Sequence, residues 1–93
     1  MPDRARYSPA PGVRWAVQRA GIMVINGAQA VEIGYPEAAL WDLVAREVPW
    51  PRAIGMLSAI AHISDIEAAK LAGDTLHEWA ASGLVVPREV DRG

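Results

Sequence analysis

The fold is decided by residues 21–41, GIMVINGAQAVEIGYPEAALW. Two apolar runs, IMVI at 22–25 and AVEI at 30–33, flank the dipeptide Asn26-Gly27. This dipeptide is typical of a two-residue turn between antiparallel strands, because both of its residues tolerate positive φ. A helical pattern begins after Pro36, since proline is favoured in the first turn of a helix. The stretch therefore predicts a β-hairpin followed directly by a helix.

An alternating segment on the N-terminal side of this hairpin predicts one more strand. In VRWAVQ at 13–18, apolar and more polar residues alternate, which is typical of a half-buried strand. We therefore expect three antiparallel strands, roughly at 13–18, 22–25 and 28–33, with Ile25 opposite Ala28 and Ile22 opposite Val31. The alternation then places one set of side chains on a single core face: Val13, Trp15, Val17, Ile22, Val24, Val31 and Ile33.

Three helices are expected after the sheet. The first follows Pro36 and ends before Pro49, and the second covers about 51–62. Ser64 and Glu67 have the spacing of a capping box and predict the start of a third helix, which ends at Gly83. The fold class is therefore α+β, a three-stranded antiparallel sheet followed by three helices. We expect one domain at 13–86, a flexible arm at 1–12 and a disordered tail at 87–93.

The composition argues against several kinds of site. The chain has 93 residues and no cysteine, which excludes disulfides and thiolate chemistry. His62 and His77 fit a helix end and a helix surface, and no phosphate loop or nucleophile motif is present. We therefore expect no catalytic residue, no metal, no cofactor and no enzyme. No apolar run reaches the roughly 18 residues of a membrane span, and residues 1–12 show no signal-peptide pattern, so a cytoplasmic location is expected.

Charge is unevenly distributed along the chain. Residues 1–20 carry four arginines and one aspartate, a net of +3, whereas residues 21–93 carry five basic and ten acidic side chains, a net of −5. An acidic body is a poor partner for nucleic acid, whose affinity depends on neutralising phosphates.

The third strand has no obvious second neighbour. With the turn at Asn26-Gly27, the backbone groups of Gln29, Val31 and Ile33 are expected to point away from the second strand. This edge is either covered by the N-terminal arm or free to accept a strand from another molecule.

The third helix has an apolar flank beside its expected core stripe of Ala69, Ala72, Leu76 and Trp79. The flank consists of Ala68, Leu71 and Thr75 at i, i+3, i+7 spacing. These residues either line a groove next to the strand edge or widen the core.

Several segments resemble the PqqD-like family, which comprises the peptide chaperone of pyrroloquinoline quinone biosynthesis and related leader-peptide recognition elements of ribosomally made, modified peptides. PGVR at 11–14, AALWDLV at 38–44 and GLV at 83–85 fit the family pattern, although Gly34 stands where the family has asparagine. The resemblance covers about residues 11–86. It implies a winged-helix-like fold in which a leader peptide adds to the third strand and packs against the third helix.

The resemblance implies a non-catalytic peptide chaperone. Its partners are the leader of a precursor peptide and a modifying enzyme such as a radical-SAM protein, a cyclase or a leader peptidase. The acidic third helix suggests a leader with a lysine or arginine near its docking segment. The contacts are expected from the third strand and the third helix: Gln29, Ala30, Val31, Glu32, Ile33, Ala68, Leu71 and Thr75.

Two alternatives remain open on the sequence. One is a winged-helix nucleic-acid-binding regulator, which the acidic third helix disfavours because a helix in the major groove is normally neutral or basic. The other is a structural subunit or homodimer that docks through the apolar outer face of the sheet, with Met23, Ile25 and Ala30.

Overall fold

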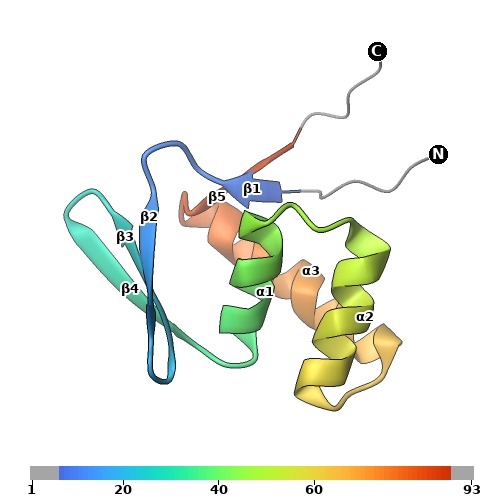
Figure 1. The fold of residues 1–93 in the computed structure, drawn as a ribbon. Coiled ribbons are helices and arrows are strands. Elements are labelled where there is room, and N and C mark those ends of the chain that lie inside the picture. Colours follow the sequence, from blue (N-terminus) through green and yellow to red (C-terminus); the bar gives the residue numbers. More distant parts are fainter. Residues whose placement is uncertain (1–6, 89–93) are drawn as a thin grey trace.

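The computed structural model describes residues 7–88 (Figure 1). The elements are β1 Tyr7–Pro9, β2 Arg14–Gln18, β3 Gly21–Asn26, β4 Gln29–Gly34, α1 Glu37–Ala45, α2 Trp50–Ala61, α3 Asp65–Ala81 and β5 Val85–Pro87. β2, β3 and β4 form an antiparallel sheet in that order, and β1 pairs with β5 in a separate two-stranded sheet. The predicted α+β class, with three antiparallel strands followed by three helices, is confirmed. The β1–β5 pair was not predicted.

The β1–β5 pair joins two segments that were not expected to form strands. Tyr7–Pro9 falls in the expected arm but pairs with Val85–Pro87, and the Ala10 N–H donates to the Leu84 carbonyl oxygen at 2.9 Å. Leu84 and Val85 are buried and belong to the core. Tyr7–Pro9 is thus part of the folded domain, although the domain was expected to start at residue 13. The rest of the expected arm and tail, residues 1–6 and 89–93, lies outside the described residues.

The turn between β3 and β4 lies one residue later than expected. Asn26 pairs with Gln29 and Ile22 with Ile33, so the predicted register, with Ile22 opposite Val31, is wrong by two residues. Gly27 has a φ of 64°, whereas Ala28 is not among the residues with positive φ. This combination fits a type II′ turn, which takes glycine at its first central position. Because the shift is even, the side chains keep the faces that the sequence predicted.

The core is centred on α1, which lies between the sheet and the other two helices (Figure 1). Trp41 is fully buried there, and its ring meets those of Trp15 and Trp79 edge to face at 5.6 and 5.3 Å. The helices cover β2 only in part, since Trp15 contacts Trp41 but is 41% exposed and Val17 is 78% exposed. The expected core face is therefore buried at β3 and at the end of β4 but open along β2.

The capping box at the start of α3 is confirmed. The Ser64 hydroxyl accepts from the Glu67 N–H at 3.1 Å, and the Glu67 carboxylate accepts from the Ser64 N–H at 3.0 Å. The hydrogen bond from the Ser64 backbone, and then that from its hydroxyl, lowers the pKa of Glu67 below its usual value of 4.5. Since the folded-state pKa is lowered, this stabilisation is present above pH 4.5 and is lost as the pH falls through the lowered value.

Candidate functional site

The hairpin register fixes which backbone groups of β4 are unpaired. Residues next to a two-residue turn exchange both of their backbone bonds, and the pattern alternates from there. Gln29 is next to the turn, so Gln29, Val31 and Ile33 bond inward to β3. The prediction that these three residues carry the outward groups is therefore wrong. The outward N–H and C=O groups belong to Ala30, Glu32 and Gly34.

The alternation on the other side of β3 agrees with this assignment. The β2–β3 turn occupies Arg19-Ala20, so Gln18 and Gly21 exchange both of their bonds. Gly21, Met23 and Ile25 then bond to β2, which leaves Ile22, Val24 and Asn26 for β4. The backbone N–H and C=O groups of each β3 residue thus bond to only one of the two neighbouring strands.

The outer edge of β4 has no strand beside it within residues 7–88. The described part of the N-terminal segment, β1, pairs with β5 instead. Of the two outcomes that the sequence left open, coverage by Tyr7–Pro9 does not occur. The strand is six residues long and carries one charged side chain, Glu32, so the edge has little of the protection that sheet edges usually carry.

A cleft of about 280 Å³ lies beside this edge. Its walls come from β4, from the start of α1 and from the C-terminal half of α3. Val31, Ile33 and Trp79 supply apolar surface, and Thr75 lies at the bottom, only 8% exposed. The complete lining is Val31, Glu32, Ile33, Gly34, Glu37, Thr75, Glu78 and Trp79.

The three α3 residues that were predicted to lie beside the strand edge differ in their positions relative to the cleft. Thr75 lines the cleft, whereas Leu71 is half-buried against the core and is not part of the lining. Ala68 is 0% exposed, so its predicted role in receiving a peptide side chain is wrong. The buried stripe runs through Ala68 rather than Ala69, which is only partly buried.

Four lining residues were not predicted: Gly34, Glu37, Glu78 and Trp79. The helical members could have been found from spacing, because Thr75, Glu78 and Trp79 follow i, i+3, i+4 and share one face. Glu37 could not, since it reaches the cleft only through the position of α1 against β4.

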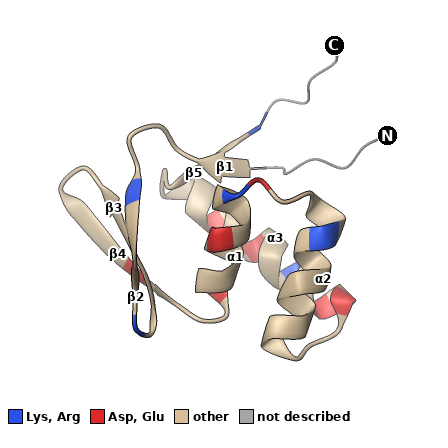
Figure 2. Cartoon of the chain, viewed as in Figure 1, with Lys and Arg blue, Asp and Glu red and all other residues tan. Residues whose placement is uncertain are grey.

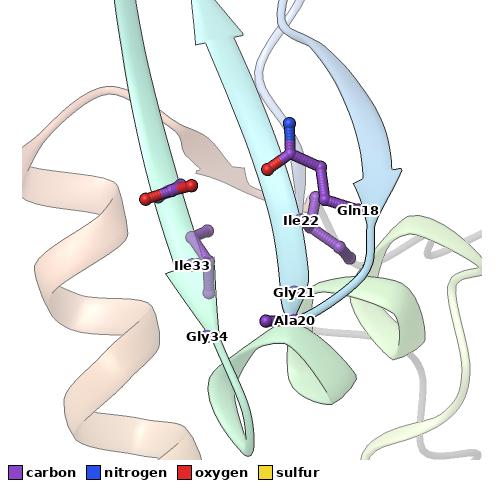
Figure 3. A pocket seen from close by; sticks show the side chains of 7 residues that line it. Gln18, Ala20, Gly21, Ile22, Ile33 and Gly34 are labelled. Carbon is purple, nitrogen blue, oxygen red and sulfur yellow. The ribbon is translucent and has the colours of Figure 1, made fainter.

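A second hollow of about 250 Å³ lies at the end of the sheet, next to the β2–β3 turn (Figure 3). Gln18, Gly21 and Gly34 form one row across the three strands, and the two glycines leave the surface recessed. A Cβ atom on Gly21 would lie 2.0 Å from the Ile33 carbonyl oxygen, so this close approach of β3 to β4 requires glycine. Glu32, Ile33 and Gly34 line both hollows, which places the end of β4 between them.

A third, larger hollow of about 530 Å³ is mostly apolar and lies between the end of β2, α1 and α2. Val17 and Tyr35 at its rim are 78% and 61% exposed, and Met56 and Ile60 of α2 are also exposed. Exposed apolar side chains are thus more numerous here than on the outer sheet face, where Ile25 is 40% exposed.

The charges around the cleft are of one sign. Figure 2 shows acidic residues on β4 and at the start of α1, whereas the basic residues of the sheet are on β2 and its turn to β3. The lining contains Glu32, Glu37 and Glu78 and no lysine or arginine. On α3, Lys70 forms an ion pair with Asp74 at 3.1 Å and does not line the cleft.

Comparisons with family models, with curated proteins and with solved structures found no match to this chain. Among residues 7–88, no group of three or more acidic, histidine or cysteine side chains is arranged to hold a metal ion. Within the same range, no helix is long and apolar enough to cross a membrane. His62, at the C-terminal cap of α2, and His77, on α3, are both exposed.

Proposed function

We propose that this chain is a peptide-binding module that takes up an extended peptide as a new strand on the outer edge of β4. The peptide is the leader of a ribosomally made precursor, which the chain presents to a modifying enzyme in the cytoplasm. The chain contributes no catalytic group and no cofactor. The sequence resemblance to PqqD-like domains and their winged-helix-like arrangement support the leader as the ligand.

The proposal rests on one observation, the unpaired outward groups of Ala30, Glu32 and Gly34 next to an open cleft. An added strand pairs with these groups through its own backbone. Each such bond contributes only about 1 kcal/mol in water, so backbone pairing alone gives weak binding. The side chains that enter the cleft must supply the remaining affinity and the selectivity.

The cleft suits every second side chain of an added strand. Successive side chains of a strand point to opposite faces, so alternate residues of the peptide face α3. There they meet the apolar surface of Val31, Ile33 and Trp79 and the hydroxyl of Thr75. Leu71 lies one helical turn before Thr75 and extends the same face of α3 beyond the cleft.

The charge of α3 favours a peptide over nucleic acid. This helix carries Asp65, Glu67, Asp74 and Glu78 against a single Lys70. A helix that enters the major groove lies against phosphates on both sides, where four carboxylates would be repelled.

Backbone N-methylation of the ligand tests strand addition without altering the protein. We expect the leader peptide of a precursor encoded beside this gene to bind, as measured by fluorescence anisotropy. Methyl groups on one alternate set of peptide nitrogens should weaken binding more than about tenfold, because they block the bonds to β4. Methyl groups on the other set point to solvent and should leave the affinity within about threefold.

The two methylated peptides are matched in composition and differ only in which nitrogens are blocked. Equal affinity of both for the protein would rule out strand addition. A gene neighbourhood with neither a short precursor gene nor a modifying enzyme would count against the leader as the ligand.

A further inference from the structure

Glu32, Glu37 and Glu78 line the cleft, but Glu32 alternates with Val31 and Ile33, so its side chain lies on the outer face of the sheet and the carboxylates that face the cleft are those of Glu37 and Glu78. None of them forms an ion pair with another residue of the described range. Three other carboxylates do form ion pairs: Asp42 with Arg46, Asp74 with Lys70 and Glu47 with Arg88. The fold thus neutralises acidic groups elsewhere and leaves those at the cleft available.

The acidic character of the cleft does not come from α3 as a whole. Glu67 is held in the capping box and Asp74 is paired with Lys70, so Glu78 is the α3 carboxylate that lines the cleft. The other cleft-facing carboxylate, that of Glu37, lies in the first turn of α1. A ligand that faces the cleft at the β4 edge therefore meets negative charge from both neighbouring helices.

We infer that the peptide segment bound at β4 carries an aliphatic residue and a lysine or arginine two positions apart, both facing the cleft. This inference rests on the proposed strand addition. β4 contributes the four residues 31–34 to the lining, so about two alternate peptide side chains face the cleft. The aliphatic one packs on Val31, Ile33 and Trp79.

The second cleft-facing side chain must suit both an apolar floor and a charged rim. Lysine and arginine do, because their methylene stems cover apolar surface while their charged ends reach the carboxylates at the rim. An acidic side chain would be repelled by Glu37 and Glu78. A neutral polar one would leave these two carboxylates without a counter-charge.

Three fluorescein-labelled decapeptides with alternating sequences provide the probes. Their cleft-facing positions alternate valine with lysine, with glutamine or with glutamate, and their other positions are threonine. We expect the lysine peptide to bind about tenfold more tightly than the glutamate peptide, with the glutamine peptide between them, since each exposed charge pair contributes modestly. Raising the salt concentration should reduce this ratio.

Two double variants locate the origin of the preference. Glu37→Gln with Glu78→Gln should reduce the lysine-to-glutamate ratio to about twofold. Asp42→Asn with Asp74→Asn changes the net charge equally but alters carboxylates outside the cleft, so it should keep the ratio. An equal reduction in both double variants would assign the preference to net charge and overturn the inference.

The NMR chemical shifts of the Ala30, Glu32 and Gly34 amides distinguish failure of this inference from failure of the proposed function. If all three peptides bind with equal affinity and shift these signals, the charge preference is overturned and strand addition stands. If none of the peptides shifts them, both are overturned.

Discussion

Val31→Pro is expected to destabilise the three-stranded sheet strongly, whereas Ala30→Pro is expected to change its stability little. The N–H of Val31 is directed into the hairpin opposite Val24, so proline there removes an interior bond and places its ring against β3. We expect a cost of about 3 kcal/mol or more, a large share of the roughly 5–15 kcal/mol that stabilises a domain. The N–H of Ala30 is directed outward, so Ala30→Pro should cost about 1 kcal/mol or less. Urea denaturation followed by circular dichroism measures both values.

The same pair of variants separates folding from binding. Ala30→Pro should remain folded but lose at least about tenfold in affinity for the leader peptide, because one bond is lost and the proline ring occupies the edge. Ala30→Val keeps the N–H and should bind normally. A folded Val31→Pro beside an unfolded Ala30→Pro would show that the hydrogen-bonding pattern of the hairpin is the reverse of the one described above.

Trp41→Ala is expected to be the most destabilising single truncation in the core, costing about 3–5 kcal/mol. The ring is 0% exposed and contacts both Trp15 and Trp79, so its loss leaves a cavity between the sheet and two helices. Trp41→Phe should cost clearly less, about 1–2 kcal/mol, because it keeps an aromatic ring. It also removes a buried Nε1–H that has no acceptor among the described residues.

Ile66 supplies the control for this measurement. It is 84% exposed in the first turn of α3, so Ile66→Ala should change the free energy of unfolding by about 0.5 kcal/mol or less. A loss below about 1 kcal/mol for Trp41→Ala would contradict the central place of this ring in the core.

Local signals in the sequence were sufficient for most of the fold. The alternation in β2 and the capping box at Ser64 each involve neighbouring residues, so they could be interpreted without the rest of the chain. The β1–β5 pair could not be found in this way. Each of its strands has three residues, too few to show a period, and they are brought together only by the tertiary fold.

The hairpin shows why the candidate site was harder to predict than the fold. In the sequence Asn26-Gly27-Ala28, a turn centred on the first two residues and one centred on the last two both place glycine at an allowed position. Both also keep the same side chains on the core face, so the apolar pattern does not distinguish them. They differ only in which backbone groups face outward, and that difference decides which residues can pair with a peptide.

Predicting the residues that line the cleft required knowing which side chains of α3 are buried. The helical spacing correctly predicted that α3 lies beside the site. It placed Ala69 rather than Ala68 on the buried face of this helix, because alanine at either position fits an apolar face. This small rotation moves Ala68 into the core and brings Glu78 to the cleft. Burial of each side chain, rather than spacing alone, separates the core from the lining.

Amide hydrogen exchange of the free and peptide-bound protein tests most directly whether β4 accepts a strand. In the free protein, the amides of Val31 and Ile33 should exchange slowly, while those of Ala30, Glu32 and Gly34 exchange quickly. Saturation with the leader peptide should slow the exchange of these last three amides by about tenfold or more and leave the Val31 amide nearly unchanged. Unchanged exchange at Ala30, Glu32 and Gly34 in the saturated complex would contradict strand addition at this edge.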